Sequence, residues 1–186
     1  MLGPLIAFAA GLTLSLATGG ALQRLGEARF LRLPLFWAGV AVSLLLAFGP
    51  EALLTYGVAL VLTSNLLMAG FALSNRHIPG LALVGVGIFL NALVIAVNGA
   101  MPVSQDAARV AASTQEVGSI KHEPLTGDTR LPILADRVPV ELTGQVWSLG
   151  DLILVAGIGW MAFALPRRRD VAPLTRPQRS SSGAAA

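Results

Sequence analysis

Two aspartates carry the chemistry most open to a functional interpretation: Asp136 in a polar stretch, and Asp151 near the start of the last apolar segment. When two carboxyl groups lie close together, their pKa values separate, so one can hold a proton while the other acts as a base. Val138, Val140 and Leu142 alternate with other residues as in a short strand, which could fold the 14 residues between the aspartates back on themselves. The pattern predicts Asp136 and Asp151 as a candidate catalytic pair.

Ser148 lies three residues before Asp151, so the two side chains share one face of a helix. A carboxylate in the first turn of a helix accepts hydrogen bonds from backbone N–H groups, which makes a structural cap one interpretation of Asp151. With Trp147 as an interfacial anchor, however, Asp151 is predicted to lie ~6 Å inside the bilayer. A carboxylate is costly at that depth, so a general acid or base, a cation ligand and a proton-transfer group are the functional alternatives.

Asparagines in the apolar segments supply further candidate binding groups. Asn91 lies near the middle of the fourth segment, at a depth close to that of Asn65 in the third. We expect a hydrogen-bonded amide pair between these two helices, with a polar binding site as the alternative. Asn98 shares a helix face with Asn91, which predicts a polar stripe rising toward the outer surface. Asn91, Asn98 and Ser148 are therefore predicted binding residues.

His122 is flanked by Lys121 and Glu123 in the polar stretch. We expect a solvated side chain, with a role in binding as the alternative. A metal site formed by His122, Asp136 and Asp151 lacks any recognised spacing of ligands. The chain has no cysteine, which excludes disulfides and thiolate chemistry, and it contains no phosphate-binding, dinucleotide-binding, haem or nucleophile-elbow motif. We therefore predict no metal and no cofactor.

The elements that must position these residues are apolar. Hydrophobic residues make up 54% of the 186 residues and charged residues only 12%, which excludes a soluble globule, a disordered chain and a coiled coil. About 20 apolar residues in a helix cross a bilayer core ~30 Å thick, and these runs show no alternation typical of strands. Five segments qualify: Leu5–Leu22, Leu33–Gly49, Ala52–Leu73, Leu81–Ala100 and Trp147–Leu165.

We therefore predict an all-α integral membrane bundle of five transmembrane helices, forming one domain over residues 1–166. A long extracytoplasmic loop, residues 101–146, is expected to pack over the outer mouth of the bundle. Residues 167–186 are rich in Pro, Arg, Ser and Ala, which predicts a basic, disordered cytoplasmic tail.

The distribution of arginines predicts the orientation of the bundle. Arg supplies 12 of the 13 basic residues, and nine of these lie in the segments 23–32, 74–80 and 167–186, which share one side if the chain crosses five times. The positive-inside rule then places the N-terminus outside and the C-terminus in the cytoplasm. The alternative for residues 1–22 is a cleaved signal peptide, but no charge precedes Arg24. Because the basic charge is explained by topology, no nucleic-acid partner is expected.

The chain resembles an uncharacterised bacterial family of small multi-pass membrane proteins, labelled as a domain of unknown function. Four stretches carry the resemblance: Asn98 to Val103, Lys121-His122, Asp136 to Pro139 and Ser148 to Asp151. It covers nearly the whole chain up to residue 166. The resemblance implies an integral membrane protein and nothing narrower. The expected location of this multi-pass protein is the bacterial cell (inner) membrane.

Around the two aspartates the chain also resembles, more weakly, lipoprotein signal peptidase, a membrane aspartyl protease. Asp136-Arg137 and Asp151 stand in positions comparable to that family's outer Asp-Arg pair and its second Asp at the start of the last helix. The chain departs from the pattern because Ser148 or Leu149 replaces the motif's Asn, and because five predicted helices replace four. The resemblance implies a catalytic aspartate pair.

Three functions follow as hypotheses. The leading one is a membrane protein without an assigned activity, acting as a structural, assembly or partner-binding component. Its predicted partners are the lipid bilayer and other membrane protein subunits. The alternatives are an aspartate-dependent membrane hydrolase acting at the outer leaflet, and a small-molecule or ion carrier that uses Asn65, Asn91 and Asp151.

Overall fold

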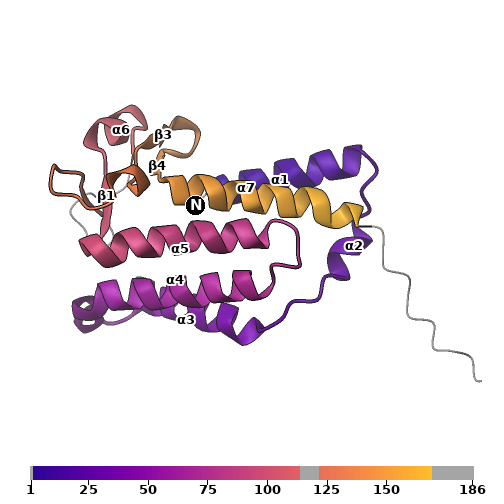
Figure 1. The fold of residues 1–186 in the computed structure, drawn as a ribbon, viewed down its shortest axis with the longest axis horizontal. Helices are drawn as coiled ribbons and strands as arrows, with labels where there is room; N and C mark the ends of the chain where they lie inside the picture. The colour runs from indigo at the N-terminus through magenta and orange to yellow at the C-terminus, as the bar shows by residue number, and fades with distance from the viewer. Residues whose placement is uncertain (1, 114–121, 169–186) are drawn as a thin grey trace, which may run out of the picture.

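The computed structural model describes residues 2–113 and 122–168, and these fold mainly into helices (Figure 1). All five predicted apolar segments form helices. The five long helices are α1 (Leu2–Ala17), α3 (Leu33–Phe48), α4 (Gly57–Ser74), α5 (Leu81–Asn98) and α7 (Leu149–Ala164). The predicted disordered tail lies outside the described residues from residue 169 onward.

The ends of the helices differ from the predicted ends by a few residues, for local reasons. α1 ends at Ala17 rather than Leu22, because Gly19 adopts a left-handed conformation and the Gly20 N–H bonds back to the Ser15 carbonyl at 2.8 Å. A 3-10 turn, η1 (Glu51–Tyr56), precedes α4. α7 begins at Leu149, two residues after the predicted start at Trp147, because Ser148 is its N-cap.

Three stretches are long and apolar enough to cross a membrane: Glu51–Ser74, Leu81–Asn98 and Leu149–Arg167. The helices α1 and α3 are also apolar, but each has 16 residues. At ~1.5 Å per residue they are ~24 Å long, somewhat less than a ~30 Å hydrocarbon core. By length and composition, the described part of the chain therefore contains three candidate membrane-spanning helices.

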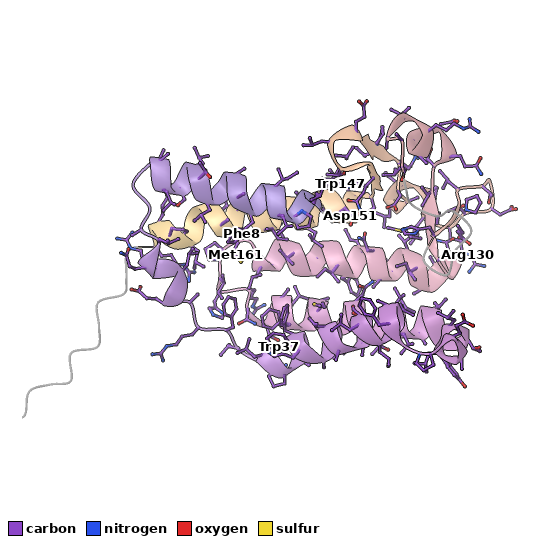
Figure 2. The ribbon with its side chains drawn as sticks, turned by 180° about the vertical axis from the view of Figure 1, so that it is seen from behind. Phe8, Trp37, Arg130, Trp147, Asp151 and Met161 are labelled. Carbon is purple, nitrogen blue, oxygen red and sulfur yellow. The ribbon has the colours of Figure 1, made fainter. Side chains whose placement is uncertain are left out.

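The long helices form a curved row in the order α1, α7, α5, α4, α3. α7 packs between α1 and α5, and α4 packs between α5 and α3 (Figure 1). The opposite view in Figure 2 shows α5 between the α1–α7 pair and the α3–α4 pair. One cavity touches Pro4 of α1 and Ser43 of α3, so the two ends of the row lie on the same side of α5.

Basic and polar segments meet at one end of this row. Asn75 is fully buried; its amide donates to the Leu31 and Phe71 carbonyls at 2.9 and 2.8 Å, and its Oδ1 accepts from the Leu31 N–H. Arg24 belongs to the short helix α2 (Gln23–Gly26), and its guanidinium group donates to the Pro166 carbonyl at 3.1 Å. The turn η4 (Leu165–Arg167) therefore lies beside the segments 23–32 and 75–77.

The opposite end carries a small folded unit, which we call the cap, made of residues 101–113 and 122–147 (left in Figure 1). Two-stranded sheets pair β1 (Met101–Val103) with β2 (His122–Pro124) in parallel, and β3 (Val138–Val140) with β4 (Gln145–Trp147) in antiparallel. The predicted strand and fold-back between Asp136 and Asp151 are therefore confirmed. The remaining elements are α6 (Gln105–Val110), η2 (Pro132–Leu134) and η3 (Glu141–Thr143).

Glycines allow α5 and α7 to approach closely. A Cβ atom added at Gly87 would lie 2.4 Å from the Gly150 carbonyl oxygen, and one at Gly157 would lie 2.7 Å from the Gly80 carbonyl oxygen. These distances are below any ordinary contact and involve backbone, which cannot swing away. Small residues at such positions let helices associate in a membrane through close packing.

We expect Gly87→Ala to lower the thermal unfolding temperature of the detergent-purified protein, because the added methyl must push α7 away, at a cost of about 1–3 kcal/mol. Gly70→Ala is the matched control. Its Cβ would lie 3.8 Å from a Leu35 methyl, an ordinary contact, so the helix preference of alanine should leave stability unchanged or raised. An equal effect of both substitutions would contradict the proposed close contact.

Candidate functional site

The site is a cavity of about 710 Å³ beneath the cap, bounded by all five long helices. Its helix residues extend from the cap end of the helices to about their middle, where Met68 of α4 and Ile88 of α5 lie. Mostly apolar walls from the helices meet polar groups of the cap. The lining residues are Pro4, Ser43, Leu46, Val61, Ser64, Asn65, Met68, Ile88, Asn91, Ile95, Met101, His122, Asp136, Gln145, Val146, Trp147, Asp151, Leu154 and Val155.

Asn91, Ser148 and Asp151 form a hydrogen-bonded network between α5 and the start of α7. The Asn91 amide donates to Asp151 Oδ1 at 2.9 Å. The Ser148 N–H donates to Asp151 Oδ2 at 3.0 Å, and the Asp151 N–H donates to Ser148 Oγ at 2.9 Å, which together form a capping box. Asp151 is therefore both the helix cap that one interpretation predicted and a group on the cavity wall. Figure 2 shows it near Trp147, at the cap end of α7.

The network contains more acceptors than donors. Ser148 Oγ lies 2.8 Å from Asp151 Oδ2 and 2.9 Å from Asn91 Oδ1. A hydroxyl has one proton, so it can serve only one of these oxygens at a time. An inter-helix hydrogen bond contributes only ~0.6 kcal/mol in a membrane protein, so this network orients Asp151 more than it stabilises the bundle.

The predicted amide pair between Asn65 and Asn91 is wrong. Both side chains line the cavity, but the hydrogen bonds of Asn91 go to Ser148 and Asp151, and none joins it to Asn65 among the described residues. The reason is the proximity of α7 to α5. A Cβ at Gly150 would lie 1.9 Å from Asn91 Oδ1, so this glycine leaves the space that the asparagine fills.

Asp136 is buried, with 3% of its surface exposed, and it lines the same cavity. Its backbone is held by β1: its N–H donates to the Pro102 carbonyl at 2.9 Å, and its carbonyl accepts from the Ser104 N–H at 2.8 Å. Its Oδ1 has no hydrogen-bond partner among residues 2–113 and 122–168. Burial, and then the nearby charge of Asp151, raise the pKa of Asp136 from 3.8 to about 8, so its carboxyl group holds a proton at neutral pH.

The structure therefore brings Asp136 and Asp151 to one cavity without joining them. Their carboxyl groups influence each other electrostatically, but no hydrogen bond connects them in the part of the chain that the structure describes. The arrangement supplies the protonated carboxyl group of Asp136 and a second carboxyl group, that of Asp151, which accepts from Asn91 and Ser148. Chemically, it can hold a polar group between them or exchange a proton with one.

His122 and Asn98 are placed differently from their predictions. His122 is half-buried in β2 and lines the cavity, so the expected solvated position is wrong. Asn98 lies outside the cavity, where it donates to the Arg130 carbonyl at 2.9 Å and accepts from the Arg130 N–H at 2.8 Å. It holds the cap loop at the end of α5, where Figure 2 labels Arg130. Within residues 2–113 and 122–168, no three His, Asp or Glu side chains gather as a metal site.

Two contacts were not predicted from the sequence: the packing of Trp147 on α1, since Trp147 was predicted only as an interfacial anchor, and a pair of serines in the cavity. The indole ring of Trp147 packs on α1 at Gly3. A Cβ atom added to this glycine would lie 2.3 Å from the ring, so only glycine leaves room for the contact. Ser43 and Ser64 line the cavity and share a hydrogen bond of 2.6 Å between α3 and α4. The serines gave no recognisable signal, whereas the aromatic residue beside a strand end could have indicated a packing anchor.

We expect the stability of the protein to fall as pH rises from about 4 to 8. Folded Asp136 keeps a proton that the unfolded chain releases above its pKa of 3.8, so unfolding releases a proton throughout this window. The loss is at most about 1.4 kcal/mol per pH unit and levels off above pH 8. The measurement is the thermal unfolding temperature in detergent at pH 5, 6, 7, 8 and 9.

Asp136→Asn should remove this pH dependence and be relatively more stable than the parent at pH 8. The control is Asp106→Asn, whose side chain in α6 is 91% exposed and which should retain the parental pH profile. A parental profile in Asp136→Asn would show that another group titrates.

Residues 27–163 match a family model described as "Family of unknown function (DUF5317)". An uncharacterised protein of Thermotoga maritima is 32% identical over 132 residues, which cover 69% of this chain and 76% of that protein. No solved structure matches the chain. The resemblance to an uncharacterised bacterial family is thereby confirmed, and these matches assign no activity.

Proposed function

Because the chain belongs to the DUF5317 family of unknown function, we propose its function from the geometry of the cavity. We propose a multi-pass membrane protein that binds one amphipathic molecule from the outer half of the bilayer. The apolar part of this molecule lies along the helix walls, and its polar end lies beside Asp136 and Asp151. One observation carries the proposal: a cavity lined by all five long helices also contains a buried carboxyl oxygen without a partner.

The proposed topology has five spans, with the N-terminus outside and the C-terminus in the cytoplasm of a bacterial cell. α1 and α3 pack alongside the longer helices, so they lie at the same depth despite their length. Arg24, Arg29, Arg32 and Arg76 belong to segments that meet residues 166–168 at the end away from the cap. The positive-inside rule supports placing this end in the cytoplasm.

Labelling of single cysteines tests this topology, because the chain has none of its own. We expect Leu142→Cys, in the cap and 76% exposed, to react with a membrane-impermeant maleimide in intact cells. Glu27→Cys, exposed at the opposite end, should react only after the membrane is permeabilised. Labelling of Glu27→Cys in intact cells, or protection of Leu142→Cys, would overturn the proposed orientation.

The shape of the cavity supports a ligand that enters from the side. Its volume of about 710 Å³ lies within the ~300–1,000 Å³ of small-molecule sites. The row of helices ends at α1 and α3, and the cavity touches both, so its free side lies between these two helices. In the proposed topology that side faces lipid, which favours an amphipathic occupant over a water-soluble one.

Filling the cavity should block binding. The measurement uses a protein in which Trp147 is the only tryptophan, because Trp37→Phe and Trp160→Phe replace the others. Phosphatidylcholine with brominated acyl chains quenches the fluorescence of Trp147 when a chain lies close to it. We expect Val155→Phe, on the cavity wall, to reduce this quenching. Leu152→Phe is the control, because Leu152 is 37% exposed on α7 and does not line the cavity. It should leave the quenching unchanged. Equal quenching in both variants would contradict binding of acyl chains in the cavity.

The second candidate is an aspartate-dependent hydrolase acting at the outer leaflet. It is favoured by two carboxyl groups in one cavity, of which Asp136 holds a proton at neutral pH. In such a site one carboxylate takes a proton from water while the carboxylic acid donates one. This candidate requires that Asp136→Asn and Asp151→Asn each abolish turnover of a membrane substrate. If the protein is instead a structural or partner-binding component, Val155→Phe, Asp136→Asn and Asp151→Asn should each leave its function intact and at most lower its expression.

A further inference from the structure

The charges around the cavity restrict what its occupant can be. The titratable groups on its wall are Asp136 from the cap, Asp151 from α7 and His122 from β2, and no Lys or Arg is among the described residues that line it. A phosphate or sulfate group would therefore meet carboxyl groups without a compensating cation. In a poorly hydrated cavity, where charges are weakly screened, that repulsion is large.

The hydrogen-bonding requirements of the wall also point to a donor. Asp136 Oδ1 is buried and has no hydrogen-bond partner among the described residues. In the network between α5 and α7, by contrast, Asp151 Oδ2 accepts from the Ser148 N–H, so the Ser148 hydroxyl proton is free to serve Asn91 Oδ1. A buried acceptor without a partner costs about 1–3 kcal/mol, which a bound donor would recover. A primary ammonium group offers three N–H donors and a positive charge.

We propose that the occupant is a cationic amphiphile, an alkyl chain with a primary ammonium head, and that its binding releases the carboxyl proton of Asp136 to water. This inference rests on the proposed function, because it assigns the chemical class of the ligand in the same cavity. The O–H bond of Asp136 breaks, the proton leaves to solvent, and the resulting carboxylate accepts from the ammonium N–H groups. One positive charge enters and one leaves, so the net charge of the cavity is conserved.

The exchange predicts how binding depends on pH. With one proton released per ligand bound, affinity rises up to tenfold per pH unit until the pH reaches the pKa of Asp136, about 8. His122 is the other titratable side chain of the cap on the cavity wall. A His122→Gln variant separates the two contributions, because only the part due to Asp136 should persist in it.

The test measures binding by the fluorescence of Trp147, as the single tryptophan of the protein in phosphatidylcholine vesicles. Three probes with the same alkyl chain are compared: dodecylamine, dodecanol and dodecyl sulfate. We expect saturable binding of dodecylamine that tightens about tenfold per pH unit between pH 6 and 7.5. Dodecanol should bind more weakly and without pH dependence, and dodecyl sulfate should show no saturable binding. Asp136→Asn should lose the pH dependence and at least tenfold in affinity at pH 8, while Asp106→Asn should behave as the parent.

The outcomes distinguish this inference from the proposed function. If dodecanol or dodecyl sulfate binds as tightly as dodecylamine and Val155→Phe blocks that binding, the cavity binds amphiphiles but the cationic class is wrong. If Asp136→Asn keeps the parental pH dependence in a His122→Gln background, the proton release is wrong. If Val155→Phe changes the binding of none of the three probes, both the inference and the proposed function fail. The unfolding temperature of each variant shows that it is folded.

Discussion

Two hydrogen bonds between α5 and the start of α7 set the geometry on which the rest of the structure depends: Asn91 donates to Asp151 and accepts from Ser148. They form because Gly87 and Gly150 leave no side chains between the two helices, so the helix backbones approach closely. The same contact holds Asp151, which completes the capping box with Ser148, toward α5. It also fixes where β4 must end, since Ser148 follows that strand directly.

From this contact the row of helices extends in both directions and curves around one side. α1 follows α7, and α4 and α3 follow α5, so the cavity is enclosed by five helices although each helix packs on only one or two others. The cap closes the polar end of the cavity. There the Asp136 N–H donates to the Pro102 carbonyl of β1 and the Asp136 carbonyl accepts from the Ser104 N–H, and the Asp136 side chain is buried away from water.

The combination of an apolar wall and two carboxyl groups without a basic side chain is unusual for a structural interface. Apolar residues at this position would stabilise helix packing more, because a buried carboxyl oxygen without a hydrogen-bond donor lowers the stability of the folded state. The protein nevertheless keeps Asp136 at this position, shielded by the cap. A ligand that supplies donors and positive charge would recover the energy that this burial costs, which is why the binding proposal explains more of the observed geometry than packing alone.

The sequence by itself determined the five apolar helices and their order along the chain, because these depend on hydropathy. It also indicated the strand after Asp136 and offered the capping of α7 as one interpretation of Asp151, because both depend on residues a few positions apart. It could not determine the partner of Asn91, the half-buried position of His122, or the separation of Asn98 from the site. Those features depend on which helices become neighbours. In lipid, a helix that is apolar on every face gives no sign of which face contacts another helix. Only the tertiary structure, through the glycine contacts of α7, decided that Asn91 meets Asp151 rather than Asn65.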